Sequence, residues 1–149
     1  MNSLLENPHL HFMREALKEA VKAFEIDEVP IGAVVVCQNK IIGRGHNLTE
    51  RLNDVTAHAE MQAITAAANY LGGKYLDECT LYVTIEPCVM CAGATQWAHL
   101  GQLVYGARDE KKGYLKISSE ILHPRTVLTR GVMEKECSEL LKEFFRQKR

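Results

Sequence analysis

Two short motifs that lie far apart in the chain constrain its fold more than any other feature. The first is His58-Ala59-Glu60, and the second is Pro87-Cys88-Val89-Met90-Cys91. One imidazole and two thiolates are ligands that zinc prefers, and zinc takes about four ligands in a tetrahedral arrangement. A fold in which this chain binds zinc must therefore bring the two motifs together.

The spacing inside the second motif suits the start of a helix. Cys88 and Cys91 are three positions apart, which places both sulfurs on one helix face. Pro87 fits the first helical turn, because the N–H that proline lacks would have no partner there. The positive end of a helix also favours thiolate over thiol. We expect His58 to lie at the start of a second helix.

Three protein ligands would leave the fourth zinc position open. Catalytic zinc sites hold water there, whereas structural sites are closed by a fourth protein ligand. Bound water reaches a pKa of roughly 7, so hydroxide forms at neutral pH. Glu60 is expected to lie beside the metal without binding it, to take a proton from the water and to pass it on.

Two other interpretations of the cysteines remain open. A Cys-x-x-Cys pair can be a redox pair, although that reading gives His58 and Glu60 no role. A closed structural zinc site is also possible, with a fourth ligand from the remaining candidates, which are Cys79, Cys137 and His99.

Composition bounds the class of protein. With 149 residues, the chain is expected to form a single domain over residues 1–149. A net charge of −1 excludes a general attraction to nucleic acid, so RNA binding would need a local basic patch. Five cysteines, an odd number, favour a reducing compartment and a cytoplasmic location. Residues 1–8 show no apolar signal segment, and no apolar run reaches membrane-spanning length, so no membrane partner is expected.

Hydrophobic periodicity predicts alternating helices and strands. Helices are expected from Pro8 to near Asp27 and over 58–71, 88–99 and 132–145. Strands are expected over 30–37, 40–46, 81–85, 103–105 and 126–129, the first two as a hairpin. This order favours an α/β layered fold with a mixed sheet, and both metal-binding helices would start at one edge of that sheet.

With these residues in hand, the chain resembles the cytidine-deaminase-like superfamily and, more narrowly, the bacterial tRNA-specific adenosine deaminases. A histidine and glutamate in H-x-E, together with P-C-x-x-C, form the signature of zinc-dependent nucleobase deaminases. The resemblance spans nearly the whole chain and is carried by Val29–Val34, Gly43–Asn47, Thr56–Glu60, Leu81–Ala94, Gly106–Asp109 and Glu143–Arg146.

The resemblance implies a three-layer α/β/α sandwich around a five-stranded mixed sheet, in a homodimer. It implies a zinc-dependent hydrolase that converts adenosine to inosine at the wobble position of a tRNA anticodon, with the anticodon stem-loop as partner. His58, Cys88 and Cys91 would bind Zn²⁺, and Glu60 would be the catalytic proton carrier. Asn47 and Asp109 match substrate-binding positions.

Both substrate-binding assignments have a structural alternative. Asn47 follows two nearby glycines, where asparagine is often a left-handed turn residue. Asp109 lies in a predicted loop, where aspartate commonly caps a turn or helix. The segment from Phe144 to Arg149 has aromatic and cationic side chains that can grip RNA, although its phenylalanines are expected to face the core.

Two departures from the family pattern raise a competing function. The loop Glu110–Lys116 is short, and the segment around Trp97 carries an aromatic side chain that resembles deaminases of free bases. A deaminase of a free nucleobase or nucleoside, such as guanine or cytosine, is therefore an alternative. A third hypothesis is an interaction module that zinc stabilises without catalysis, in which Glu60 would be dispensable.

Overall fold

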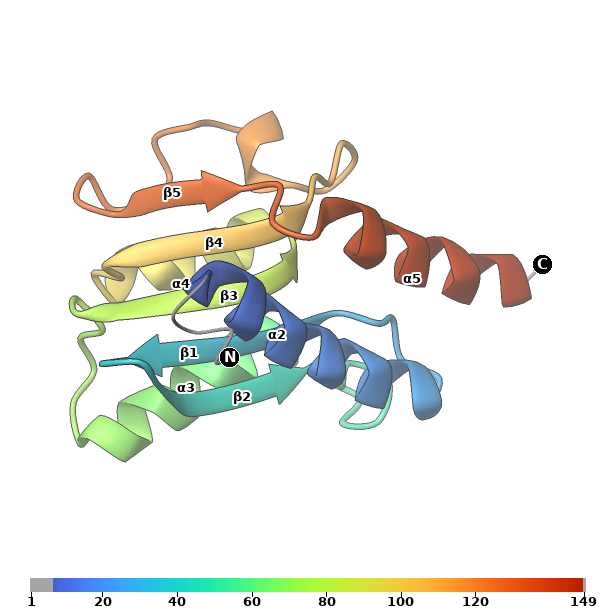
Figure 1. Ribbon diagram of the computed structural model, residues 1–149, viewed down its shortest axis with the longest axis horizontal. Helices are drawn as coiled ribbons and strands as arrows, with labels where there is room; N and C mark the ends of the chain where they lie inside the picture. The colour runs from blue at the N-terminus through green and yellow to red at the C-terminus, as the bar shows by residue number, and fades with distance from the viewer. Residues whose placement is uncertain (1–6, 149) are drawn as a thin grey trace.

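The computed structural model describes residues 7–148 and contains a five-stranded mixed sheet (Figure 1). The segment before Asn7 and the final residue of the basic tail lie outside the described residues. The strands have the order β2-β1-β3-β4-β5 and comprise β1 (Gly32–Cys37), β2 (Lys40–His46), β3 (Cys79–Ile85), β4 (Gln102–Ala107) and β5 (Val127–Arg130). Strand β1 is antiparallel to β2 and β3, whereas β3, β4 and β5 run parallel.

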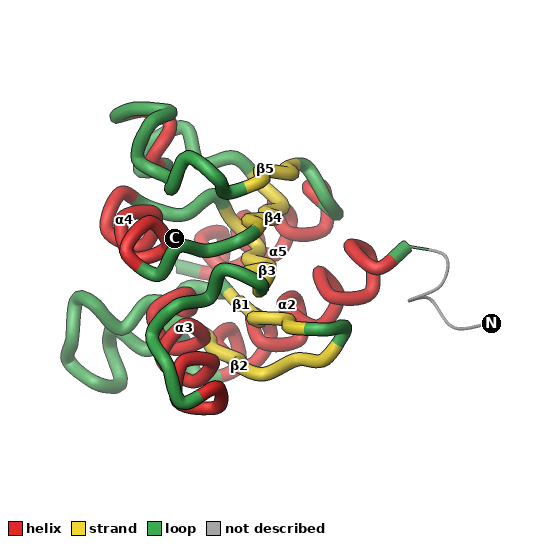
Figure 2. The backbone as a smooth tube through the Cα atoms, turned by 90° about the vertical axis from the view of Figure 1, so that its left-hand side faces the viewer, coloured by secondary structure: helices red, strands yellow, loops and turns green. Residues whose placement is uncertain are grey.

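Helices cover both faces of the sheet, as expected for an α/β/α sandwich. In the part of the chain that is described, they are α2 (Pro8–Glu25), α3 (Ala59–Leu71), α4 (Val89–Trp97) and α5 (Glu134–Gln147), with a short 3₁₀ turn at Tyr114–Lys116. Figure 2 shows the sheet edge-on, with α3 and α4 on one side and α2 and α5 on the other. None of these helices combines the length and apolar character that crossing a bilayer requires.

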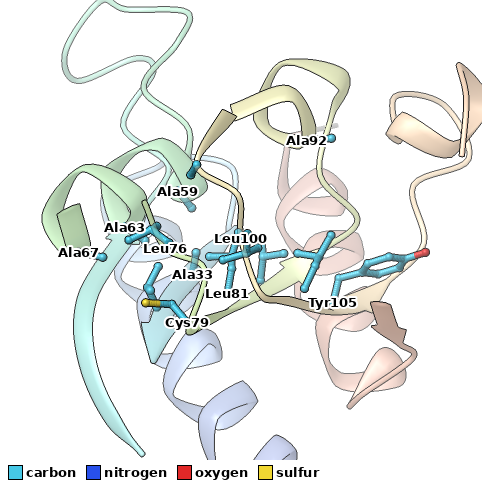
Figure 3. Packing of buried hydrophobic residues seen from close by; sticks show 14 of the residues in the cluster. Ala33, Ala59, Ala63, Ala67, Leu76, Cys79, Leu81, Ala92, Leu100 and Tyr105 are labelled. Atoms are coloured by element: carbon cyan, nitrogen blue, oxygen red, sulfur yellow. The ribbon is translucent and has the colours of Figure 1, made fainter. Parts of the chain in front are cut away.

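Each face of the sheet has its own hydrophobic core. The α3/α4 side buries alternate strand residues such as Val35, Leu81 and Leu103, against the alanines of α3 (Figure 3). The α2/α5 side buries the residues between them, including Val34, Tyr82 and Val104. This alternation follows from the pleat, which points successive side chains to opposite faces.

Helix α3 packs unusually close to β2, because small residues meet there. A Cβ atom added to Gly45 would lie 2.4 Å from the carbonyl oxygen of Ala59, and one added to Gly43 would lie 2.4 Å from that of Ala63. The glycines therefore let the helix backbone rest on the strand, which sets the position of the first turn of α3.

The predicted elements are present, with shifts at their ends. Helix α4 ends at Trp97 instead of 99, since His99 has left-handed backbone with φ of 54°. Helix α5 begins at Glu134 instead of 132, since Met133 has φ of 56°. A left-handed residue cannot continue a right-handed helix, which accounts for both corrections. Strands β3 and β4 are longer than expected, and the helix predicted from 58 starts at Ala59.

Candidate metal centre and active site

The structure brings His58, Cys88 and Cys91 together at the starts of two helices. His58 is the N-cap of α3 and Cys88 the N-cap of α4, with Cys91 in the first turn of α4. Nδ1 of His58 lies 3.6 Å from Sγ of Cys88 and 3.5 Å from Sγ of Cys91. Within residues 7–148, no other group of three or more histidine, cysteine or acidic side chains converges in this way.

These distances fit a tetrahedral zinc ion. With Zn–S of about 2.3 Å, Zn–N of about 2.1 Å and a tetrahedral angle, nitrogen and sulfur are separated by about 3.6 Å. Three ligand atoms at this spacing would fill three of the four positions around a zinc ion. The alternative fourth ligands Cys79, Cys137 and His99 are not part of the group, so the structure supplies no fourth ligand from them.

Hydrogen bonds among His58, Cys88 and Cys91 favour the thiolate form of Cys88. Bonding from Cys91, and then from His58, lowers the pKa of the Cys88 thiol to about 4. In return, the hydrogen bond between His58 and Cys88 raises the pKa of His58, and the separate hydrogen bond between Cys91 and Cys88 raises the pKa of the Cys91 thiol. Hydrogen bonds therefore already hold the three side chains in contact, and a bound metal ion would displace the protons of these bonds.

Glu60 lies in the first turn of α3 and is only 3% exposed. Burial, as the largest cause, raises the pKa of its carboxyl to about 7, and the Cys88 thiolate acts in the same direction. A carboxyl with a pKa near neutrality can both accept and donate a proton at physiological pH. The chain therefore places a carboxyl that can take up or release a proton near neutral pH beside the candidate metal ligands.

The candidate substrate residues lie in two loops attached to this centre. Asn47 directly follows β2 and is 6% exposed, and its N–H donates to the carbonyl of Ile31 at 3.1 Å. Its φ is not positive, so it is not a left-handed turn residue. The next residue, Leu48, donates its N–H to the carbonyl of Ala57 at 2.9 Å, which ties this loop to the residue before His58.

Asp109 caps a turn, which is the structural role considered for it above as an alternative to substrate binding. Its Oδ1 accepts the N–H groups of Lys111 and Lys112 at 3.1 and 3.0 Å. Its carbonyl accepts the N–H of Gly113 at 2.9 Å, and Gly113 forms a β-bridge with Cys88. The loop of Asp109 is therefore in direct contact with a candidate metal ligand, whether or not Asp109 also touches a substrate.

A cavity of about 820 Å³ lies beside this loop, between it and α5. Its walls combine apolar side chains with cations, namely Val29, Ile31, Ile85, Leu141, Phe145, Lys111, Lys112, Lys142 and Arg146, together with Asp109 and Ser138. The expectation that the tail phenylalanines face the core holds for Phe144, which is 6% exposed, but is wrong for Phe145, which is 48% exposed.

Trp97 lies at the opposite end of α4 from the cysteines. It lies nine positions after Cys88, roughly 13 Å along the helix axis, and it is 80% exposed. Its aromatic ring is therefore distant from the candidate metal ligands of the same chain, and the free-base alternative gains no support from it.

Two buried acids that the sequence patterns do not single out hold the loops of Asn47 and Asp109. Glu28 and Glu86 are 1% and 4% exposed, and each accepts hydrogen bonds from backbone N–H groups of a loop. The available signal was an acidic residue shortly before proline at the edge of an apolar strand, in Glu28-Val29-Pro30 and Glu86-Pro87. A charge in such a place needs hydrogen-bond partners.

Comparisons with known proteins agree with this geometry. The family model described as MafB19-like deaminase matches residues 7–149. A tRNA-specific adenosine deaminase of Agrobacterium fabrum is 46% identical, with 93% of this chain and 95% of that protein covered. The counterpart from Streptococcus pyogenes serotype M18 is 44% identical and covers 93% of this chain and 91% of its own.

A solved structure from a study of A-to-I editing by tRNA:A34 deaminases has a TM-score of 0.81 and 44% identity, over 87% of this chain and 98% of that one. This likeness extends to the five-stranded sheet and its covering helices, which have the cytidine-deaminase-like arrangement. The chain belongs to the tRNA-specific adenosine deaminases, within the MafB19-like deaminase family.

Proposed function

We propose that this protein is a zinc-dependent deaminase that converts adenosine to inosine at the wobble position of a tRNA anticodon. The observation that carries the proposal is the convergence of His58, Cys88 and Cys91 at zinc-binding distances, with the buried Glu60 beside them. The family to which the chain belongs supports tRNA as the substrate.

In the proposed mechanism, His58, Cys88 and Cys91 would hold Zn²⁺, which would supply water activated for attack at neutral pH. Glu60 would take one proton from the attacking water as its oxygen bonds C6 of the purine, and would deliver that proton to the ring nitrogen next to C6. Glu60 would then carry the second proton of the former water to the amino group, so that the C6–N bond breaks and adenosine and water give inosine and ammonia. The pKa of about 7 suits Glu60 to both transfers.

The cavity between the loop of Asp109 and α5 supports an RNA substrate. Lys111, Lys112, Lys142 and Arg146 line it, and the exposed ring of Phe145 faces it. Cations neutralise phosphates and aromatic rings stack on unpaired bases, so this combination suits single-stranded RNA even in a chain of net charge −1. Asn47 and Asp109 are proposed to contact the target nucleotide or its neighbours. The loop of Asn47 leads to His58, and the loop of Asp109 is bridged to Cys88.

A homodimer and a cytoplasmic location belong to the same proposal. Val89 and Trp97 are 49% and 80% exposed and lie two turns apart on α4, and a Cβ added to Gly93 between them would touch nothing. An exposed apolar stripe of this kind suits contact with a second copy. A tRNA substrate and five free cysteines suit the cytoplasm.

The deciding experiment incubates zinc-loaded protein with an anticodon stem-loop that carries adenosine at the wobble position. We expect inosine at that position, and none from a matched stem-loop with the adenosine moved to the stem. No inosine at high enzyme concentration would refute the RNA substrate. Ammonia release from free guanine, cytosine or nucleosides, without any from RNA, would support the free-base alternative. No turnover with any of these substrates would support the interaction module.

A further inference from the structure

The two buried acids, Glu28 and Glu86, have no role in the mechanism above. Neither forms an ion pair with any residue in the described part of the chain. A buried carboxylate without a cation is costly unless several hydrogen bonds satisfy its oxygens. Each of these two carboxylates is satisfied by backbone N–H groups of a single loop, and both loops reach the candidate active site.

Glu86 holds the two ends of the loop at 109–115. Its Oε1 accepts the N–H of Asp109 at 3.1 Å, and its Oε2 accepts the N–H of Leu115 at 3.0 Å. Gly113 lies between these ends, so close that an added Cβ would be 2.1 Å from Oε2 of Glu86. The loop therefore wraps around the carboxylate, and its bridge from Gly113 reaches Cys88.

Glu28 holds the turn that follows Asn47. Its two carboxylate oxygens accept the N–H groups of Glu50 at 3.2 Å and of Arg51 at 2.7 Å. This turn belongs to the loop that begins with Asn47 and ends directly before His58. The arrangement resembles that of Glu86. In both cases a buried acid holds a loop that contains a candidate substrate residue and that is connected to a candidate metal ligand.

We propose that Glu28 and Glu86 are positioning residues, each of which fixes one wall of the active site relative to the metal ligand beside it. Glu28 places the loop of Asn47, and Glu86 places the loop of Asp109. The substrate contacts in this statement rest on the proposed function, whereas the loop positions do not. At each site the two N–H donors approach different oxygens of the carboxylate, so the NH₂ group of a glutamine would face one of them, donor against donor.

Amide hydrogen exchange of the zinc-loaded full-length protein tests the positioning directly. We expect Glu86→Gln to accelerate exchange across residues 109–115 by roughly tenfold or more and to leave 48–52 unchanged, since a bond to a charged group is lost. Glu28→Gln should do the reverse, so each variant is the control for the other. Unchanged exchange in both loops, or equal acceleration throughout the chain, would overturn the proposal.

Gly113→Ala provides a second way to disturb the same contact. The added methyl group must push the loop away from Glu86, so this variant should reproduce the exchange pattern of Glu86→Gln with the acid intact. Normal exchange at 109–115 in this variant would contradict the role of the contact between Gly113 and Glu86.

Steady-state kinetics with the anticodon stem-loop then test the effect on substrate. We expect each glutamine variant to raise KM roughly tenfold, with kcat within threefold and one zinc per chain retained. In an Asp109→Ala background, Glu86→Gln should raise KM by a smaller factor than it does in the wild-type protein, because both substitutions act through one loop. A fall in kcat that parallels zinc loss would show a structural role instead. If the wild type makes no inosine, the proposed function fails, while the exchange experiment still decides the positioning.

Discussion

Glu60 keeps an ionisable carboxyl where water hardly reaches it, at 3% exposure. A residue chosen only for stability would be apolar or would have a cation there, because desolvation opposes the charged form. The raised pKa, about 7, is the consequence of that burial. Perturbed groups of this kind cluster at functional sites, which is why the residue is more informative than the exposed acids of the same chain.

Replacing Glu60 with glutamine tests the residue without changing its size. We expect kcat to fall by about 10²–10⁴-fold or more, because the amide cannot carry a proton between water and purine. Metal analysis should still find one zinc per chain, since the proposed ligands are unchanged. Retained turnover in Glu60→Gln would contradict the proton role, and loss of zinc would show that Glu60 is a ligand after all.

Among the elements, α3 is the one whose placement decides the site, because it carries His58 at its cap and Glu60 in its first turn. Its alanines and the glycines of β2 allow backbone to rest on backbone. Close packing of this kind transmits displacement, because interiors have little free volume to absorb an added atom.

Gly45→Ala should therefore disturb both stability and metal binding. The new methyl group would lie 2.4 Å from the carbonyl oxygen of Ala59, and relieving this overlap should lower the free energy of unfolding by about 1–3 kcal/mol. Because Ala59 follows His58, zinc affinity should fall as well. Gly73→Ala is the matched control, since its Cβ would touch nothing and its φ is not positive. Equal denaturation curves and zinc titrations for the two variants would contradict this account.

The contact between α2 and β2 depends on an ionic cluster. Arg44 bonds Glu15 at 2.6 Å and the buried Glu19 at 3.1 Å. Hydrogen bonding to Arg44 lowers the pKa of Glu15. For Glu19, burial raises the pKa, but bonds to Lys22, His46 and Arg44 outweigh it, and the net shift is downward.

Arg44→Met should therefore have an effect that depends on pH. Acids with lowered pKa stabilise the fold above their ordinary value of 4.5, and this stabilisation is lost as pH falls through the folded pKa. Because the Arg44 side chain is 39% exposed and solvent screens its ion pairs, we expect the variant to lose about 1 kcal/mol in urea unfolding at pH 7, and this stability difference from the wild type to narrow below pH 4. Lys18→Met is the control, because Lys18 is 67% exposed and should change stability little. A difference in unfolding free energy between the variant and the wild type that does not change with pH would contradict an electrostatic role for Arg44.

For the whole molecule, sequence patterns predicted what is local or chemically specific. The order of strands and helices follows from periodicity, and the end of α3 follows from Gly72, whose φ is 70°. The candidate metal ligands could be named because zinc accepts few side-chain types. The partners of Glu28 and Glu86 could not be predicted, because backbone N–H groups are the same at every residue. The outward position of Phe145 depends on tertiary packing, which no local pattern encodes, whereas the separation of Trp97 from Cys88 follows from the helix expected over 88–99.

Zinc removal tests how much of the protein's stability comes from the metal and how much from the two hydrophobic cores. The metal would join the starts of α3 and α4, but the two cores on either face of the sheet are built without it. We therefore expect the chelated protein to lose activity and to melt at a lower temperature, yet to unfold cooperatively with its helical circular dichroism retained, unlike a small zinc finger that unfolds without metal. Added zinc should restore both activity and melting temperature, and the same thermal shift should occur in Glu60→Gln, which lacks turnover but keeps the ligands. Full activity after complete removal of zinc would contradict the metal's proposed role, and complete unfolding would show that the two cores do not suffice.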